Sequence, residues 1–217
     1  MTTRLRVYNG ALLLCGETRL ASLDENREAR YALDEVWNNG GAEYCLEQGQ
    51  WKFATRTSKF TYDAAIAPDF GYRRGFTKPS DWLATSALCT DEYLNSPLLD
   101  YADEAGFWYA DYDDLYIAYV SNDADFGGDL TKWPATFADY VSAHFAYRVL
   151  PNLTGANEDR LDYIRKEGDR RLLAAKNADA RSGPTKFPAP GRWVLSRRGG
   201  GRGGPLGDRG SSGSLTG

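Results

Sequence analysis

The spacing of the apolar residues changes twice along the chain, and no other feature constrains the fold as strongly. Apolar residues recur every three to four positions up to Trp51, follow in short extended runs, and return to helical spacing after Pro134. Strands placed between two helical stretches are typical of an α+β domain. With 42% hydrophobic residues among 217, the chain has enough apolar surface for one core.

The first helical stretch is predicted to hold two helices. Val7–Leu14 carries apolar residues on one face and ends at Gly16. Ser22-Leu-Asp-Glu then forms a capping-box pattern, which predicts the start of a long helix that runs through Cys45. Asn38–Gly41 would normally indicate a turn, but the apolar spacing keeps its phase across these residues. We therefore favour one helix with a bent centre.

The second helical stretch is predicted to form a pair of antiparallel helices. Pro134 begins one helix, which runs to Pro151, and residues 157–178 supply the next. The short link between them is typical of an αα hairpin. The inward-facing residues of the last helix are expected to be Leu161, Ile164, Leu172 and Ala175.

Between the helical stretches, turn residues separate short extended segments that predict an antiparallel sheet. Residues 90–95 fit either a helical turn or a strand end. The expected fold is α+β, with three to four helices, a small antiparallel sheet, a body over residues 1–181 and an extended Gly/Arg-rich arm over residues 182–217. The predicted strands are Thr55–Tyr62, Tyr72–Thr77, Leu98–Ala102, Phe107–Asp111 and Leu115–Val120.

The formal net charge is −4, and the charged residues are distributed unevenly along the chain. From Pro79 to Thr131 there is no Lys or Arg, against twelve Asp and Glu, whereas the end of the chain from Arg197 carries four Arg and one Asp. The acid-only stretch should repel a phosphate backbone, so the body is a poor candidate for tight binding of nucleic acid.

Residues suited to catalysis or metal binding are few. The single histidine, His144, lies within a predicted helix, where a packed side chain is more common than a catalytic base. Cys15, Cys45 and Cys89 are far apart and are expected to be buried thiols. No nucleotide-binding or metalloprotease motif occurs, so we expect neither an enzyme nor a cofactor or metal site.

Acidic residues leave two other chemistries open. Asp123, Asp125 and Asp129 surround two glycines and could offer oxygen ligands to calcium, although a solvated acidic loop fits the spacing better. A pair of carboxylates could also hydrolyse a glycoside, but the separation that this requires exists only in three dimensions. A cell-wall hydrolase therefore stays an alternative function.

The segment Arg197–Gly204 resembles an RGG box, which binds nucleic acid through charge and stacking. It has few arginines and no interleaved aromatic residues. A flexible arm that becomes ordered on a protein partner is the favoured interpretation, and a nucleic-acid-binding accessory protein or an inert terminus are the alternatives.

Six fragments, taken in order over about residues 7–198, resemble the tail tubular protein A family of short-tailed bacteriophages, the head-to-tail adaptors. This sequence departs from the family pattern at Gly40 and Gly41 and after Arg198. The fragments are Asn9-Gly-Ala-Leu, Ser22-Leu-x-Glu, Trp51-Lys-Phe-Ala-Thr-Arg, Pro79-Ser-Asp, Tyr119-Val before Trp133-Pro134, and Arg192-Trp193 through Arg197.

The resemblance implies a virion structural protein that is assembled in the host cytoplasm. Twelve subunits would form a ring between the portal protein and the tail nozzle or tail tube, with genomic DNA passing through the lumen. The acid-only stretch would repel that DNA if it lines the lumen, and would be a solvated surface if it faces outward. The candidate lumen residues are Asp111, Asp113, Asp114, Asp123 and Asp125.

The C-terminal arm is the part that would grip the portal according to the resemblance. Trp193 is expected to be its apolar anchor, while Arg192, Arg197 and Arg198 pair with acidic groups of the portal. Trp193 could instead fold back on its own subunit. No apolar run reaches the roughly 20 residues of a membrane helix, so we expect a protein of a cytoplasm-like compartment and no membrane partner.

Overall fold

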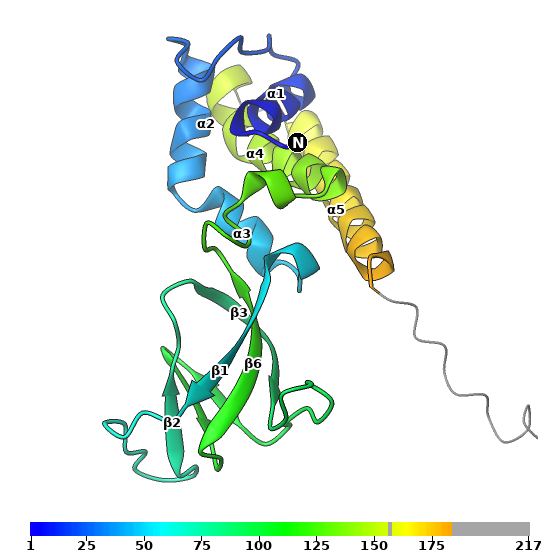
Figure 1. The fold of residues 1–217 in the computed structure, drawn as a ribbon. Coiled ribbons are helices and arrows are strands. Elements are labelled where there is room, and N and C mark those ends of the chain that lie inside the picture. The colour runs from blue at the N-terminus through cyan, green and yellow to red at the C-terminus, as the bar shows by residue number, and fades with distance from the viewer. Residues whose placement is uncertain (156–157, 184–217) are drawn as a thin grey trace, which may run out of the picture. The chain divides into compact units, whose positions relative to one another are not determined.

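The computed structural model describes residues 1–155 and 158–183, and it confirms the α+β prediction (Figure 1). Met1–Gly183 forms one compact unit, while residues 184–217, which hold most of the predicted arm, lie outside the described part. Five helices and two three-stranded antiparallel sheets make up the described residues. The elements are α1 (Arg4–Cys15), α2 (Glu28–Asn38), α3 (Gly41–Glu47), β1 (Thr55–Thr61), β2 (Arg74–Thr77), β3 (Trp82–Cys89), β4 (Ala102–Glu104), β5 (Phe107–Ala110), β6 (Asp114–Ser121), α4 (Ala135–Thr154) and α5 (Glu158–Arg181).

Helix α1 begins three residues before the predicted Val7 and ends at the predicted Gly16. The Thr3 hydroxyl accepts a hydrogen bond from the Arg6 backbone N–H at 3.2 Å, which caps the first turn. Gly16 takes the left-handed conformation, with φ at +73°, and its N–H donates to the carbonyls of Leu12 and Leu13. The predicted end of the first helix is therefore confirmed.

The predicted capping box does not open a helix. Glu25 accepts a hydrogen bond from the Ala21 N–H at 2.8 Å, and Ser22 accepts one from Asp24 at 3.3 Å, so these side chains stabilise a loop. Helix α2 begins only at Glu28, after an extended Arg27. The prediction was wrong because the Arg27 guanidinium binds carbonyls in the preceding loop and holds this segment out of the helix.

The prediction of one long bent helix was also wrong. Helix α2 ends at Asn38 and α3 begins at Gly41, with Gly40 between them at a φ of +79°. A Cβ atom at Gly41 would lie 2.7 Å from the Val36 carbonyl oxygen, so the backbone passes too close to α2 there for any other residue. The apolar spacing keeps its phase because both α2 and α3 pack against α4.

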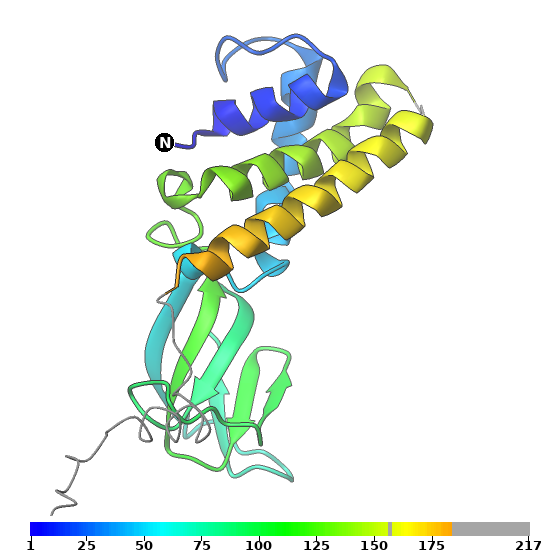
Figure 2. The same ribbon diagram turned by 90° about the vertical axis from the view of Figure 1, so that its right-hand side faces the viewer.

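The predicted αα pair is confirmed as α4 and α5, which run side by side along the helical part (Figure 2). Pro134 is the N-cap of α4, and Pro151 lies inside its last turn, so this helix extends three residues beyond the predicted end. On α5, Ile164 and Ala175 are buried, and Leu161 and Leu172 pack against the same core, as expected.

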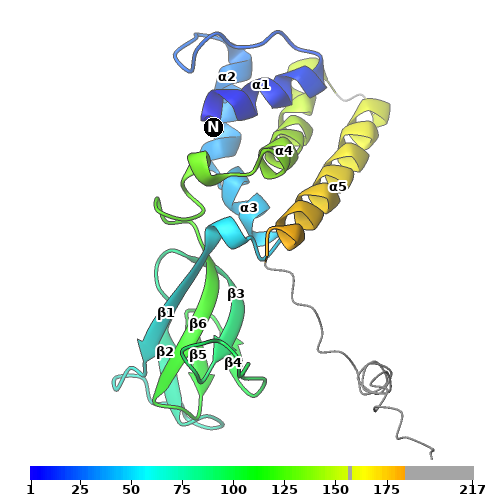
Figure 3. The same ribbon diagram turned by 45° about the vertical axis from the view of Figure 1, so that its right-hand side comes forward.

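The strands form two sheets instead of one. Strand β6 is the centre of the order β1-β6-β3, and β5 is the centre of β2-β5-β4 (Figure 3). Strand β3 was missed because Trp82–Cys89 holds small and polar residues without clear alternation, and its pairing with β6 contains two register shifts. The predicted strand Leu98–Ala102 is wrong apart from its last residue, which starts β4. Residues 90–95 form a turn in which the Asp91 carboxylate accepts bonds from two backbone N–H groups.

Two apolar clusters hold these elements together. The larger one joins all five helices and reaches Val120 at the end of β6. The smaller one lies between the two sheets, where Trp108 and Tyr119 are each at most 1% exposed. Lys52 links the helical and β parts, because its backbone N–H donates to the Asp179 carboxylate at 3.0 Å and its ammonium group donates to the last carbonyls of α5.

Candidate functional site

The five candidate lumen acids occupy opposite ends of strand β6. Asp111 and Asp113 lie in the turn before the strand and Asp114 is its first residue, whereas Asp123 and Asp125 follow its end at Ser121. The strand itself spans about 23 Å from Asp114 to Ser121. The fold therefore does not gather the five carboxylates into one patch, and whether either group faces a lumen stays a prediction.

Each acidic end of β6 has its own partners. Asp113 pairs with Arg74 at 2.7 Å, and Asp114 pairs with Lys59 at 2.9 Å. Hydrogen bonds from Lys59 and Thr61 hold the pKa of Asp114 below its ordinary value. The stretch without Lys or Arg in sequence is thus partly neutralised in space, because β1 and β2 bring basic residues beside it.

The proposed calcium loop is occupied by internal contacts. Asp123 accepts the Asp125 N–H at 2.9 Å, while Asp129 accepts two bonds from Thr131, which hold its pKa below the ordinary value. Within residues 1–155 and 158–183, no group of three His, Cys, Asp or Glu residues is placed to hold a metal ion. These contacts favour an acidic loop without calcium over a calcium site.

Asp81 joins three elements at the junction of the helical and β parts. Its carboxylate accepts bonds from Ser121 at 2.5 Å and Arg56 at 3.0 Å, and the Tyr119 hydroxyl lies 3.3 Å away. Burial raises the pKa of Asp81, but the bonds from Ser121 and Arg56 outweigh it and lower the pKa overall. This carboxylate is fixed in place, which indicates a structural role.

Lys78 lies in an aromatic enclosure within the β part. Its side chain is 5% exposed, its ammonium group is 3.8 Å from the centre of the Trp82 ring, and it pairs with Asp103 at 2.5 Å. Asp103 also accepts a bond from Thr85, whose oxygen accepts one from Trp108 at 2.9 Å. The sequence reasoning missed this enclosure because its members come from separate strands and turns.

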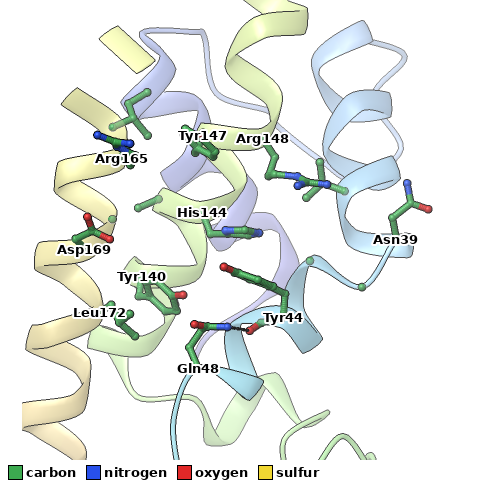
Figure 4. A pocket seen from close by; sticks show the side chains of 16 residues that line it. Asn39, Tyr44, Gln48, Tyr140, His144, Tyr147, Arg148, Arg165, Asp169 and Leu172 are labelled. Atoms are coloured by element: carbon green, nitrogen blue, oxygen red, sulfur yellow. Dashed lines mark hydrogen bonds between the residues drawn. The ribbon is translucent and has the colours of Figure 1, made fainter. Parts of the chain in front are cut away.

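A groove of about 460 Å³ lies between α3, α4 and α5 in the helical part (Figure 4). Its walls combine aromatic side chains with glycines and a few charged groups at the rim. The lining residues used below are Tyr44, Tyr140, His144, Arg148, Arg165 and Gly168. The sequence reasoning treated His144 as a packed residue and did not identify the groove.

Electrostatics in the groove keep its histidine neutral. The His144 ring stacks on Tyr44, with centroids 4.6 Å apart and planes 19° apart. Burial and, second, the nearby Arg148 lower the pKa of His144 to about 4. A neutral imidazole stacked on a phenol ring presents a flat, amphipathic wall, which is suited to binding an aromatic group.

One pair of carboxylates that shares a pocket does not suit hydrolysis. Asp139 and Glu167 line the same shallow pocket. However, hydrogen bonds from Arg170 and Arg171 lower the pKa of Glu167, whereas a general acid needs a raised pKa.

The three cysteines are buried, as expected. No helix in the described part of the chain is long and apolar enough to cross a membrane.

The predicted portal-contact residues lie outside the described residues. Arg192, Trp193, Arg197 and Arg198 all fall within residues 184–217, as does the RGG-like segment. A scan of known protein-family models finds no match to this chain, and a search of curated proteins finds no significant relative.

Proposed function

We propose that the protein is a head-to-tail adaptor of a short-tailed bacteriophage. Twelve copies form a ring that joins the portal to the tail nozzle or tube, and the genome passes through the lumen during ejection. The role is structural and requires no catalysis. One observation carries the proposal: the sequence fragments that resemble the adaptor family are used by the fold to join its elements.

Asn9 and Trp51 illustrate this use within the helical part. The Asn9 amide donates to the Leu20 carbonyl at 3.1 Å and accepts from the Leu20 N–H at 2.7 Å, which fixes the loop after α1. Trp51 is 1% exposed, and its indole N–H donates to the Cys45 carbonyl at 3.3 Å.

Such contacts also occur in three fragments that lie within the β part or beside it. Arg56 and Asp81 come from two different fragments and form an ion pair at 3.0 Å. The Trp133 indole N–H donates to the Gly127 carbonyl at 2.8 Å just before α4 begins. Residues that join elements help to determine a fold. The fragments that contain these residues follow the order of the adaptor family that they resemble, and this order supports an adaptor fold. The step from fold to function rests on analogy.

The charge of the β part suits the wall of a DNA channel. Residues 55–133 contain fourteen Asp and Glu against six Lys and Arg. Arg56, Lys59, Arg74 and Lys78 form ion pairs with some of the acidic residues. The acidic residues still outnumber the basic ones, so this part keeps a net negative charge. Such a surface repels phosphate and lets DNA pass without binding.

Exposed apolar residues on two neighbouring loops suit contact with the tail. Phe70 is 90% exposed and Leu99 is 91% exposed. Their loops are joined by a hydrogen bond of 2.8 Å from the Tyr72 hydroxyl to the Asp100 carboxylate. Large apolar side chains at loop tips favour a protein partner, and the tail nozzle or tube is the partner that we propose.

Portal binding by the C-terminal arm is the decisive test. A chain ending at Gly183 keeps α5 and its contacts with Lys52. We expect it to remain folded, with unchanged circular dichroism, and to lose binding to purified portal rings in sedimentation. In the full chain, Trp193→Ala should weaken binding more than Leu206→Ala, a control in the same segment. A truncated chain that joins portal rings as well as the full chain would contradict the proposal.

The alternative functions give different results in the same set of experiments. Nucleic-acid binding that falls with salt and disappears on changing Arg197, Arg198 and Arg202 would favour an accessory protein that acts through its RGG-like tail. Clearing of a peptidoglycan zymogram would favour a cell-wall hydrolase. We expect neither result.

A further inference from the structure

The groove between α3, α4 and α5 has space that its own subunit does not fill. Gly168 lies in the middle of α5, and a Cβ atom built on it would meet nothing within 4 Å. A glycine inside a helix costs about 1 kcal/mol relative to alanine, and no contact within the subunit requires it here. Tyr44, on the opposite wall, is 48% exposed. The groove is therefore open to an incoming side chain.

The rim of the groove favours a partner that carries negative charge beside an aromatic ring. Arg148 is exposed, and no described residue forms an ion pair with it. Arg165 pairs only with Asp162, at 3.0 Å, in a contact where both side chains are largely exposed. Asp169 is the one carboxylate among the lining residues. Below the rim, the stacked Tyr44 and His144 rings offer the flat wall.

A surface of the required chemistry exists on the outer face of α2. Glu28, Tyr31 and Glu35 are all exposed and are spaced by three and four residues, so they form one stripe. Tyr31 is 53% exposed, and the Arg30 guanidinium lies 4.0 Å from the centre of its ring. No described residue pairs with either glutamate. We call this set the α2 stripe.

The α2 stripe cannot reach the groove of its own subunit. Val36 of the same helix lines the groove, and Tyr31, five residues earlier, projects about 140° away from it around the helix axis. The stripe must therefore meet the groove of another molecule. A contact between two different patches of identical chains is heterologous, which is the type of contact that builds rings.

We infer that the groove is the docking site for the α2 stripe of a second copy of this chain. Tyr31 enters beside Tyr44, His144 and the open space at Gly168, and the flanking glutamates approach Arg148 and Arg165. The inference rests on the proposed function, because it identifies this docking as the contact between neighbouring subunits of the proposed ring.

Charge reversal tests this pairing without disturbing the fold. Arg148, Glu28 and Glu35 form no ion pair in the described part of the subunit, so Arg148→Glu and the double variant Glu28→Lys/Glu35→Lys should fold normally. In sedimentation velocity over a concentration series, each variant should self-associate at least about tenfold more weakly than the wild type. The triple variant, and an equimolar mixture of the two, should regain association because the charges are complementary again.

Control variants separate the pairing from general charge effects. Lys176→Glu on α5 and Glu92→Lys in the β part change exposed charges away from the groove and the stripe, and they should associate like the wild type. Gly168→Leu fills the open space and should weaken association while circular dichroism stays unchanged. Unaltered association in Arg148→Glu and Gly168→Leu, or a wild-type chain that stays monomeric at every concentration, would overturn the inference.

The chain ending at Gly183 distinguishes this inference from the proposed function. Both the groove and the α2 stripe lie within the compact unit, so the truncated chain should still self-associate while it loses portal binding. Loss of self-association in the charge-reversed variants with normal portal binding would support the inference alone. Portal binding without any stripe-dependent association would leave the proposed function standing and refute the pairing.

Discussion

The enclosure around Lys78 gives a prediction whose size follows from burial. In Lys78→Met, the new side chain fills a similar volume, so little cavity forms. The ammonium group is lost from its place 3.8 Å above the Trp82 ring and 2.5 Å from Asp103. Removing one partner of a buried ion pair leaves the other charge without compensation. Because the Asp103 side chain is 33% exposed, we expect the lower end of the usual range, about 3 kcal/mol of unfolding free energy.

Lys59→Met is the matched control. Lys59 and Asp114 form an ion pair of similar length, 2.9 Å, but their side chains are 51% and 43% exposed. Water compensates the remaining charge after the substitution, so the loss of unfolding free energy should be much smaller than in Lys78→Met. A second variant, Lys78→Met with Asp103→Asn, removes both charges and should recover part of the stability lost by Lys78→Met alone.

Urea unfolding followed by tryptophan fluorescence measures these differences. Trp82 and Trp108 lie beside Lys78, so the signal reports directly on the enclosure. A cost of this size should move the unfolding midpoint by about 1 M or more for Lys78→Met, and much less for Lys59→Met. Equal midpoints for the two variants would refute the argument that burial sets the magnitude.

Acid should remove the contribution of Asp103. Burial raises the pKa of Asp103, but the bonds from Lys78 and Thr85 and the charge of Lys78 outweigh it, so the folded pKa lies below the ordinary 3.8. The stabilisation is therefore present above pH 3.8 and is lost as the pH falls through the folded pKa. As the pH falls from 3.8 through the folded pKa of Asp103, the difference in unfolding free energy between the wild type and Asp103→Asn should become smaller.

Two further predictions concern the helical part and the thiols. Gly40→Ala should lower the unfolding free energy by about 1–2 kcal/mol because Gly40 has a φ of +79°. Gly168→Ala should raise the unfolding free energy by about 0.5–1 kcal/mol because a Cβ atom there meets nothing within 4 Å. Thermal unfolding of both variants checks the two signs. Burial raises the pKa of all three thiols, that of Cys15 to about 11, so a thiol reagent at pH 8 should label the native chain far more slowly than the chain in urea; rapid labelling of Cys15, Cys45 or Cys89 would contradict their burial.

Local signals predicted the parts of the fold whose stabilising contacts lie close in sequence. Gly16 ends α1 because its left-handed conformation satisfies carbonyls only a few residues away. The α4–α5 pair followed from helical spacing and a short link. At Ser22, by contrast, the capping pattern formed its bonds without starting a helix, because Arg27 binds carbonyls outside the pattern. Local chemistry alone could not predict whether the Ser22 pattern would start a helix or stabilise a loop.

Periodicity and charge are properties of the chain, so they were enough to predict the α+β class, the order of helical and extended stretches and the acidity of residues 79–131. Tertiary structure alone decided strand β3, whose place depends on pairing with β6 and not on its own alternation. It also decided which acids are neutralised, since the basic partners come from β1 and β2. The groove with Gly168 likewise exists only where α3, α4 and α5 meet, because residues distant in sequence form its walls.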